Sequence, residues 1–436
     1  MQSFRRIRPS DILLGFLFIA IVLAGTFVYM NRERMIYSWD EANYTFLTGL
    51  TYEAFFPAHP DPPGDTFRPI YGLRNIHGSF AREYNQLFTL PLAFFERAFG
   101  TSRTVFVLGV SLLFLIPFSV FWGLVAGRIF DLPKRVAFWG TLGLILVMPA
   151  TYLAVLRGFP DIGGAALLGL AVLLYLRDIE LRSGWQCAAI GLVLCIMPLF
   201  RRHFMYGMSA FLVAAILQHA VLLVQTLMRD PKEGSKYFLH MAGRLIMIGL
   251  TVAALWLIFA YPFVHILVSN NYFNLYEGFM IPPTKVLSGF ASAYGYVTCL
   301  LAVLGYILGY RFGVLRGAQA QFVTLLACLA ALQWVFVVRQ QGTHYLNHFS
   351  IYLVFGILAL IATVHKTTRA LPRSTLLSVI GIALAYRFVF TFGWMKAIDS
   401  PNGDGIAMAQ QPPKVRADYD EVKRLISDLR RDASSG

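Results

Sequence analysis

Two adjacent carboxylates, Asp40 and Glu41, follow directly on the first long apolar segment of the chain. Carboxylates are costly to place near lipid and contribute nothing to the packing of an apolar bundle. Beside a bound hydroxyl group, a carboxylate acts as a general base. The pair is therefore the first candidate for chemistry. The alternative is a charge pair that is stabilised by the dipole of a helix N-terminus.

Four arginines at the ends of later apolar segments form a second candidate group: Arg157, Arg201, Arg202 and Arg339. Guanidinium groups bind phosphate through paired hydrogen bonds. Arg157 precedes Pro160 and Asp161, and proline suits the first position of a helix, so we expect an anion-attracting helix N-terminus beside Arg157. Alternatively, these arginines extend to the membrane interface and anchor helix ends there.

Two further sets of polar residues are weaker candidates. Glu83 either assists at the site or is a solvated loop charge. His59, Asp61 and Asp65 have side chains of types that bind metal ions, but nothing in their spacing requires a metal. The three prolines among them favour an ordinary turn cluster.

The composition indicates a polytopic membrane protein. Of the 436 residues, 57% are apolar and only 14% are charged, and the mean hydropathy is +0.61. Lys and Arg outnumber Asp and Glu by 37 to 23, and many of the basic residues lie in short connections between apolar segments. Membrane topology and anionic lipid or phosphate ligands explain this surplus better than nucleic acid does.

A spanning helix needs about 20 mostly apolar residues, and this criterion predicts an all-α fold with about eleven such helices. We expect them near 12–30, 104–127, 136–153, 161–176, 185–200, 204–225, 244–267, 286–310, 319–338, 348–364 and 374–394. The chain then divides into a membrane domain, 1–394, and a tail, 395–436, with a short charged helix. The long first loop, 31–103, carries aromatic residues at spacings that favour interfacial helices.

The basic residues predict the orientation of the chain. With the N-terminus in the cytoplasm, thirteen Lys and Arg residues lie in or beside the short inner connections, and five lie in the short outer ones. The inner connections of membrane proteins carry the excess of Lys and Arg. We therefore expect the N-terminus inside, and the C-terminus, Asp40 and Glu41 outside.

The order of these motifs resembles the GT-C superfamily of glycosyltransferases that use polyprenyl-phosphate sugars. The nearest branch is that of the protein mannosyltransferases and lipid A aminoarabinose transferases. The first helix, followed at once by Trp39-Asp40-Glu41 and Tyr44, carries the resemblance. Three later stretches are similar to the same branch: Tyr84 to Gly100, Leu156 to Asp161 and Gln341 to Tyr345.

The resemblance covers roughly residues 10–365, and the chain departs from the family pattern at two points. Where many relatives have His-Pro-Pro before the second helix, this chain has Glu83-Tyr84-Asn85. It also lacks a large outer C-terminal domain, so we expect loops to recognise the acceptor.

The resemblance implies a reaction at the outer face of a bacterial inner membrane. An acceptor hydroxyl attacks the anomeric carbon of a polyprenyl-phosphate sugar, and the lipid phosphate leaves, with inversion expected. Asp40 is the implied general base, and Glu41 is expected to position the acceptor or the loop. The implied donor-binding residues are Arg157, Asp161, Arg201, Arg202, Arg339, His344 and Tyr345, and the implied acceptor-side residues are Tyr44, Glu83 and Tyr84.

The resemblance also implies the partners. The donor is a polyprenyl-phosphate-linked sugar, the acceptor is a glycan, lipid or protein, membrane lipid surrounds the chain, and nucleic acid has no role. No cofactor is expected to be required, and a divalent metal stays an open alternative.

A lipid transporter or flippase without transferase activity is the competing function, because the same arginines would hold a lipid phosphate. Transporters tend to carry ionisable residues deep within their spans and to have symmetric halves. Here the charges gather at the expected outer edge, and no internal repeat is visible. A purely structural membrane partner would leave Asp40 and Glu41 without a role.

Overall fold

The computed structural model describes residues 8–32, 40–56, 87–269, 277–342 and 344–392, together with Arg424 and Asp428. Within these ranges the chain is almost wholly helical, and its only β-structure is an isolated bridge between Phe130 and Leu315. The all-α fold that the sequence predicts is confirmed. The tail helix and the His59 to Asp65 cluster lie outside the described residues.

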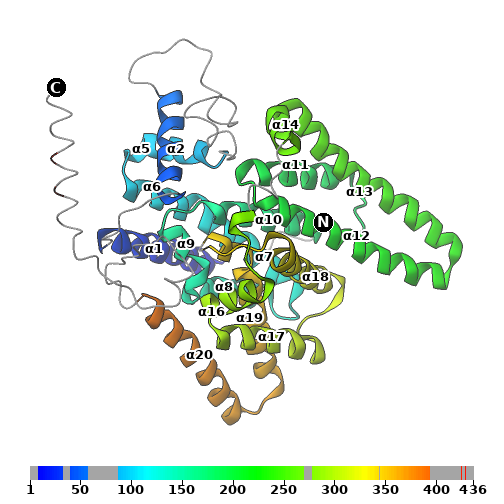
Figure 1. The fold of residues 1–436 in the computed structure, drawn as a ribbon. Helices are drawn as coiled ribbons and strands as arrows, with labels where there is room; N and C mark the ends of the chain where they lie inside the picture. Colours follow the sequence, from blue (N-terminus) through cyan, green and yellow to red (C-terminus); the bar gives the residue numbers. More distant parts are fainter. Residues whose placement is uncertain are drawn as a thin grey trace.

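The helices follow one another along the chain with short connections (Figure 1). The first half contains α1 (Pro9–Arg32), α2 (Asp40–Phe55), α5 (Thr89–Phe99), α6 (Arg103–Val110), η1 (Ser111–Leu115), α7 (Ile116–Ile129), α8 (Lys134–Val147), η2 (Pro149–Thr151), α9 (Leu153–Leu156), α10 (Asp161–Tyr175) and α11 (Gly184–Phe200). The second half contains α12 (Phe204–Arg229), α13 (Pro231–Phe259), α14 (Tyr261–Ser269), η3 (Glu277–Phe279), α16 (Pro283–Tyr294), α17 (Tyr296–Arg311), α18 (Gly317–Gln333), η4 (Trp334–Val338), η5 (His344–His348), α19 (Ser350–Thr367) and α20 (Ala370–Phe392).

Six stretches of the described chain are helical, long and apolar enough to cross a membrane, and the protein is an integral membrane protein. They are Pro9–Asn31, Arg103–Ile129, Phe204–Arg229, Pro231–Phe259, Gly317–Val338 and Ser350–Thr367. α10 and α11 are apolar but shorter. The expected count of eleven spanning helices is not confirmed.

Two of the expected spans differ from the structure for local reasons. The helix expected at 244–267 begins instead at Pro231, because the Asp230 side chain accepts hydrogen bonds from the backbone N–H groups of Lys232 (2.9 Å) and Glu233 (3.3 Å) and caps it. The helix expected at 286–310 is broken into α16 and α17, which are bent by 95°. The break falls at Gly295, whose φ of +93° other residues rarely adopt.

Close helix packing holds the second half of the bundle together. α17 lies against α19, and a Cβ atom added to Gly305 would lie only 1.7 Å from the carbonyl oxygen of Gly356. Small residues allow two helix backbones to approach this closely, which is a common basis of helix association in membranes.

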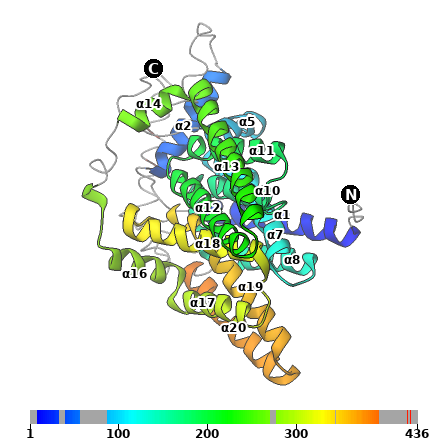
Figure 2. The same cartoon turned by 90° about the vertical axis from the view of Figure 1, so that its right-hand side faces the viewer.

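Three of the expected inner connections, 128–135, 311–318 and 365–373, meet at one end of the bundle. Asp131 lies 3.3 Å from Arg316 and 3.4 Å from Lys366, and Asp11, at the start of α1, lies 2.6 Å from Arg135. These ion pairs join the ends of α7, α17 and α19 to the starts of α1, α8 and α18. α2 and α5 lie side by side, far from α20, in both views (Figures 1 and 2).

Candidate active site

A buried ion pair is the centre of the candidate site. Nε of Arg201 lies 3.1 Å from Oδ1 of Asp161, and the two side chains are only 2% and 0% exposed. Buried charges are costly to desolvate unless they are paired. The sequence expectation that both residues belong to one site is therefore consistent with the geometry, although the pairing itself was not anticipated.

Two glycines allow the helices that carry this pair to approach each other. Asp161 begins α10, and Arg201 follows the last residue of α11. A Cβ atom on Gly163 would lie 2.3 Å from the ring of Phe200, and one on Gly164 would lie 2.3 Å from the ring of Phe204. Because neither glycine has a side chain, the start of α10 packs directly against the rings on both sides of the Arg201 turn.

Helix α2 covers the ion pair through an aromatic residue. The guanidinium carbon of Arg201 lies 4.5 Å from the ring centroid of Tyr44, which is fully buried. Tyr44 also makes edge contacts with Phe88 and Phe159, at centroid distances of 5.6 and 5.7 Å. Tyr44 thereby joins α2 to the segments before α5 and α10.

The position of Tyr44 also indicates where Asp40 lies. Asp40 is the first residue of α2, one helical turn before Tyr44, so the two positions share a face of the helix. The backbone of α2 therefore brings Asp40 to the side of the helix that covers Arg201. The side chains of Asp40, Glu41 and His344, and the whole of Glu83 and Tyr84, lie outside the described residues.

Arg157 and Arg202 are buried as well, with exposed fractions of 1% and 7%. The Arg157 guanidinium carbon lies 5.8 Å from the ring centroid of Phe159. The backbone carbonyl of Arg157 accepts a hydrogen bond from the Arg103 side chain (3.1 Å). Such burial argues against side chains that merely extend to the membrane interface. The arrangement concentrates positive charge near the start of α10.

The late loop reaches the same region through Tyr345. Its hydroxyl donates to Oε1 of Gln340 (2.8 Å) and lies 3.3 Å from Nε2 of His203, the residue after Arg202. Gln340 is held in turn, because its backbone carbonyl accepts a hydrogen bond from the Trp334 indole (3.1 Å). Gln340 was not singled out from the sequence, although it belongs to a loop that is dense in hydrogen-bonding groups.

The described contacts of Arg339 are with the segment before α16. Its backbone is left-handed (φ +55°), its Nε donates to the carbonyl of Ile281 (3.0 Å), and its own carbonyl accepts from the Ile281 N–H (2.9 Å). These contacts tie the late loop to the segment before α16. They give Arg339 a structural role there, and its expected part in donor binding stays a prediction.

His348 is a second residue that the sequence did not single out. Its ring stacks on that of Phe204 at 4.2 Å. Burial, together with the nearby charge of Arg201, lowers the pKa of His348 to about 3. His348 is therefore neutral at physiological pH and offers neutral hydrogen-bonding atoms beside the ion pair.

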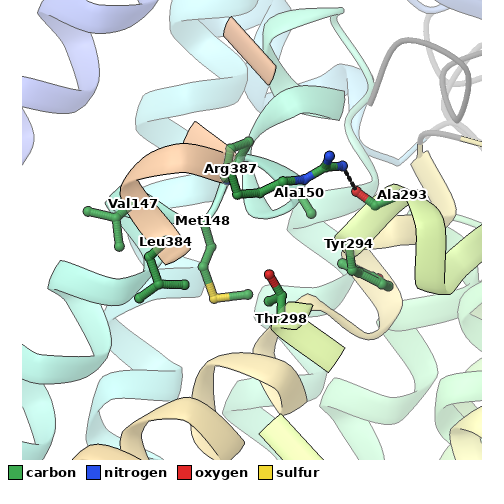
Figure 3. A pocket seen from close by; sticks show the side chains of 9 residues that line it. Val147, Met148, Ala150, Ala293, Tyr294, Thr298, Leu384 and Arg387 are labelled. Atoms are coloured by element: carbon green, nitrogen blue, oxygen red, sulfur yellow. Dashed lines mark hydrogen bonds between the residues drawn. The ribbon is translucent and has the colours of Figure 1, made fainter. Parts of the chain in front are cut away.

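A small pocket lies between the end of α8 with η2, the bend between α16 and α17, and α20 (Figure 3). It is mostly apolar, and Arg387 of α20 crosses it and donates to the carbonyl of Ala293 (2.5 Å) at the end of α16. Arg387 thus satisfies a carbonyl that the break before α17 leaves without a helical partner. Its role in the described contacts is to hold the bent pair of helices.

Comparison with known proteins supports the fold. No family model and no curated protein sequence matches the chain. Among solved structures, it is similar to ArnT from Cupriavidus metallidurans bound to undecaprenyl phosphate, with a TM-score of 0.54 and 15% identity over 89% of this chain and 70% of that one. The apo state of the same protein gives a TM-score of 0.54 and 16% identity over 88% and 65%. The chain has an ArnT-like fold.

The ArnT-like fold confirms the resemblance predicted from the sequence at the level of architecture. At 15–16% identity the likeness shows the fold alone. The roles of individual residues depend on the geometry described above.

Proposed function

We propose that this protein is an integral-membrane glycosyltransferase that moves a sugar from a polyprenyl phosphate to an acceptor hydroxyl on the extracytoplasmic side. The observation that carries the proposal is the buried Arg201–Asp161 pair under Tyr44, within an ArnT-like fold. The ArnT structure holds undecaprenyl phosphate, the class of lipid that the proposed donor contains.

In the proposed reaction, Asp40 accepts a proton and the buried arginines bind the leaving phosphate. The acceptor oxygen attacks the anomeric carbon, the carbon–oxygen bond to the phosphate breaks, and its electron pair leaves with the phosphate. The hydroxyl proton passes to the carboxylate of Asp40, the proposed base. Arg201, Arg157 and Arg202 supply fixed positive charge for the leaving phosphate. Attack opposite the leaving group gives inversion.

The short helices support a site that lies below the membrane surface. α10 has 15 residues and rises about 22 Å, less than the hydrocarbon core of about 30 Å. The connection after α10, 177–184, is an expected inner one, so we place Asp161, at the start of α10, below the outer boundary. A phosphate carried by a membrane lipid reaches such a depth, whereas a soluble nucleotide sugar would have to enter lipid.

The proposal is tested by transfer from radiolabelled polyprenyl-phosphate sugars to a cell-envelope extract, with purified protein in lipid. We expect Asp40→Asn to lose transfer by at least a hundredfold and to keep donor binding, because it removes only the proton acceptor. Glu53→Gln, an exposed carboxylate on the same helix, is the matched control and should transfer at the wild-type rate.

Each other outcome has a definite meaning. Full transfer by Asp40→Asn would contradict the base assignment. Donor binding by wild-type protein without transfer to any acceptor would favour the transporter or flippase.

A further inference from the structure

Arg103 is an arginine near the candidate site that the proposed mechanism does not use. It is the first residue of α6, where a positive charge opposes the dipole of the helix. Its side chain does not simply extend to the membrane interface, because Nη2 donates to the backbone carbonyl of Arg157 (3.1 Å), 54 positions away. A cation in an unfavourable place with a specific, distant partner indicates a role at the turn that carries Arg157.

Two backbone hydrogen bonds form this turn at the end of α9. The N–H of Gly158 donates to the carbonyl of Val155 (2.8 Å). The N–H of Phe159 donates to the carbonyl of Ala154 (2.9 Å). Together with the φ of +86° at Gly158, these bonds make the Schellman pattern that ends many helices. The pattern satisfies two carbonyls of the last turn but leaves the carbonyl of Arg157 without a partner from α9.

Arg103 supplies the donor that the Arg157 carbonyl needs. Arg157 is only 1% exposed, so an unsatisfied carbonyl there would be costly. The same guanidinium lies against the turn itself, since a Cβ atom on Gly158 would be 3.2 Å from Nη1 of Arg103. Arg103 therefore fixes the backbone from which the Arg157 side chain extends.

We propose that Arg103 is a positioning residue that holds Arg157 in place for the phosphate of the polyprenyl donor. The inference rests on the proposed function and adds a residue to it. Arg103 acts through the backbone of Arg157 and does not itself contact the phosphate. A guanidinium whose backbone is fixed before the donor arrives loses less conformational freedom on binding, and this raises the affinity.

A double-variant cycle measures whether Arg103 acts through Arg157. The Kd of undecaprenyl phosphate is measured in lipid nanodiscs for the full chain as wild type, Arg103→Met, Arg157→Met and the double variant. We expect Arg103→Met to weaken binding about tenfold, the equivalent of one hydrogen bond to a charged group. In the Arg157→Met background the same substitution should change the Kd by no more than about twofold, because no guanidinium remains to be positioned.

Three further variants test the contact and the charge separately. Arg103→Lys keeps a charged donor for the carbonyl and should recover most of the affinity. Gly158→Ala is strained by the φ of +86° and presses on the Arg103 guanidinium, so it should weaken binding only when Arg157 is present. These two changes carry the same cycle if Arg103→Met does not fold. Arg97→Met is the matched control, because it removes an exposed cation from α5, and it should leave the Kd unchanged.

Equal losses from Arg103→Met with and without Arg157 would overturn the inference and make Arg103 a phosphate ligand in its own right. A lower thermal midpoint with an unchanged Kd would also overturn it and leave Arg103 as a structural residue only. Wild-type affinity in Arg157→Met would overturn it as well, since Arg157 would then not bind the phosphate. A wild-type protein that fails to bind undecaprenyl phosphate would instead contradict the proposed function, so the two failures are distinguishable.

Discussion

At the residue scale, Arg201 has a structural role and a proposed chemical role that paired variants separate. Arg201→Gln removes the cation of the buried pair with Asp161, and we expect a loss of about 3–5 kcal/mol in the free energy of unfolding. The double variant Arg201→Met/Asp161→Leu replaces the pair with apolar groups and should recover most of that loss.

Donor binding then distinguishes the two roles. The stable double variant should bind undecaprenyl phosphate at least tenfold more weakly than wild type, because it lacks the cation that holds the phosphate. Thermal unfolding and ligand binding in nanodiscs are the measurements. Wild-type affinity in the double variant would show that Arg201 is not a phosphate ligand.

Glu96 on α5 gives a prediction about pH. Burial raises the pKa of this carboxyl to about 7, from 4.5 in an exposed state. An acid whose pKa is raised by folding contributes most stability below pH 4.5, and that contribution is lost as the pH rises to about 7. The change is at most about 3 kcal/mol.

The pH dependence of wild-type stability does not isolate Glu96, because the shifted pKa of His348 changes the stability in the opposite direction. Its lowered pKa makes the fold more stable as the pH rises from about 3 to 6.5. Glu96→Gln keeps the shape of the side chain and cannot ionise. The thermal midpoint of Glu96→Gln relative to wild type should therefore rise between pH 4.5 and 7. A constant difference across that range would contradict a buried, neutral Glu96.

At the element scale, the contact of α10 with the rings before and after Arg201 depends on the absence of side chains at Gly163 and Gly164. Gly164→Ala would place a methyl group 2.3 Å from the Phe204 ring and force α10 away from α12. We expect a loss of about 1–3 kcal/mol and reduced transfer. Gly143→Ala in α8 meets nothing within 4 Å and should be neutral or slightly stabilising. Thermal midpoints and transfer rates check both variants, and equal behaviour of the two would exclude the packing explanation.

At the scale of elements, the sequence predicts the positions of the helices but not all of their boundaries and bends. Apolar runs predict where helices lie, and all eleven expected segments overlap helices in the structure. The runs do not show the cap that starts α13 at Asp230 or the bend at Gly295, because single residues produce both.

For the site, the family resemblance named Arg157, Asp161 and Arg201 as donor-binding residues, and that role stays a prediction. The sequence did not indicate that Asp161 and Arg201 pair with each other, since the partners are forty positions apart. It also did not indicate the left-handed backbone of Arg339 (φ +55°) or its hydrogen bond to Ile281.

At the scale of the whole molecule, the two ends of the bundle have different chemistry. One end joins the expected inner connections through exposed ion pairs such as those of Asp131. The other end holds buried arginines beneath α2. A donor that arrives within the outer leaflet reaches this second end only if the basic connections face the cytoplasm, so orientation and mechanism depend on each other.

Cysteine labelling measures the orientation directly. In a chain whose four native cysteines are replaced, Lys285→Cys places a thiol at the exposed start of α16, and Lys232→Cys places one at the exposed start of α13. We expect a membrane-impermeant maleimide to label Lys285→Cys in intact cells and Lys232→Cys only after permeabilisation, because Lys and Arg are enriched inside. The reverse pattern would place the buried arginines towards the cytoplasm. It would contradict the use of an outer-leaflet donor even if the protein transferred sugars in detergent.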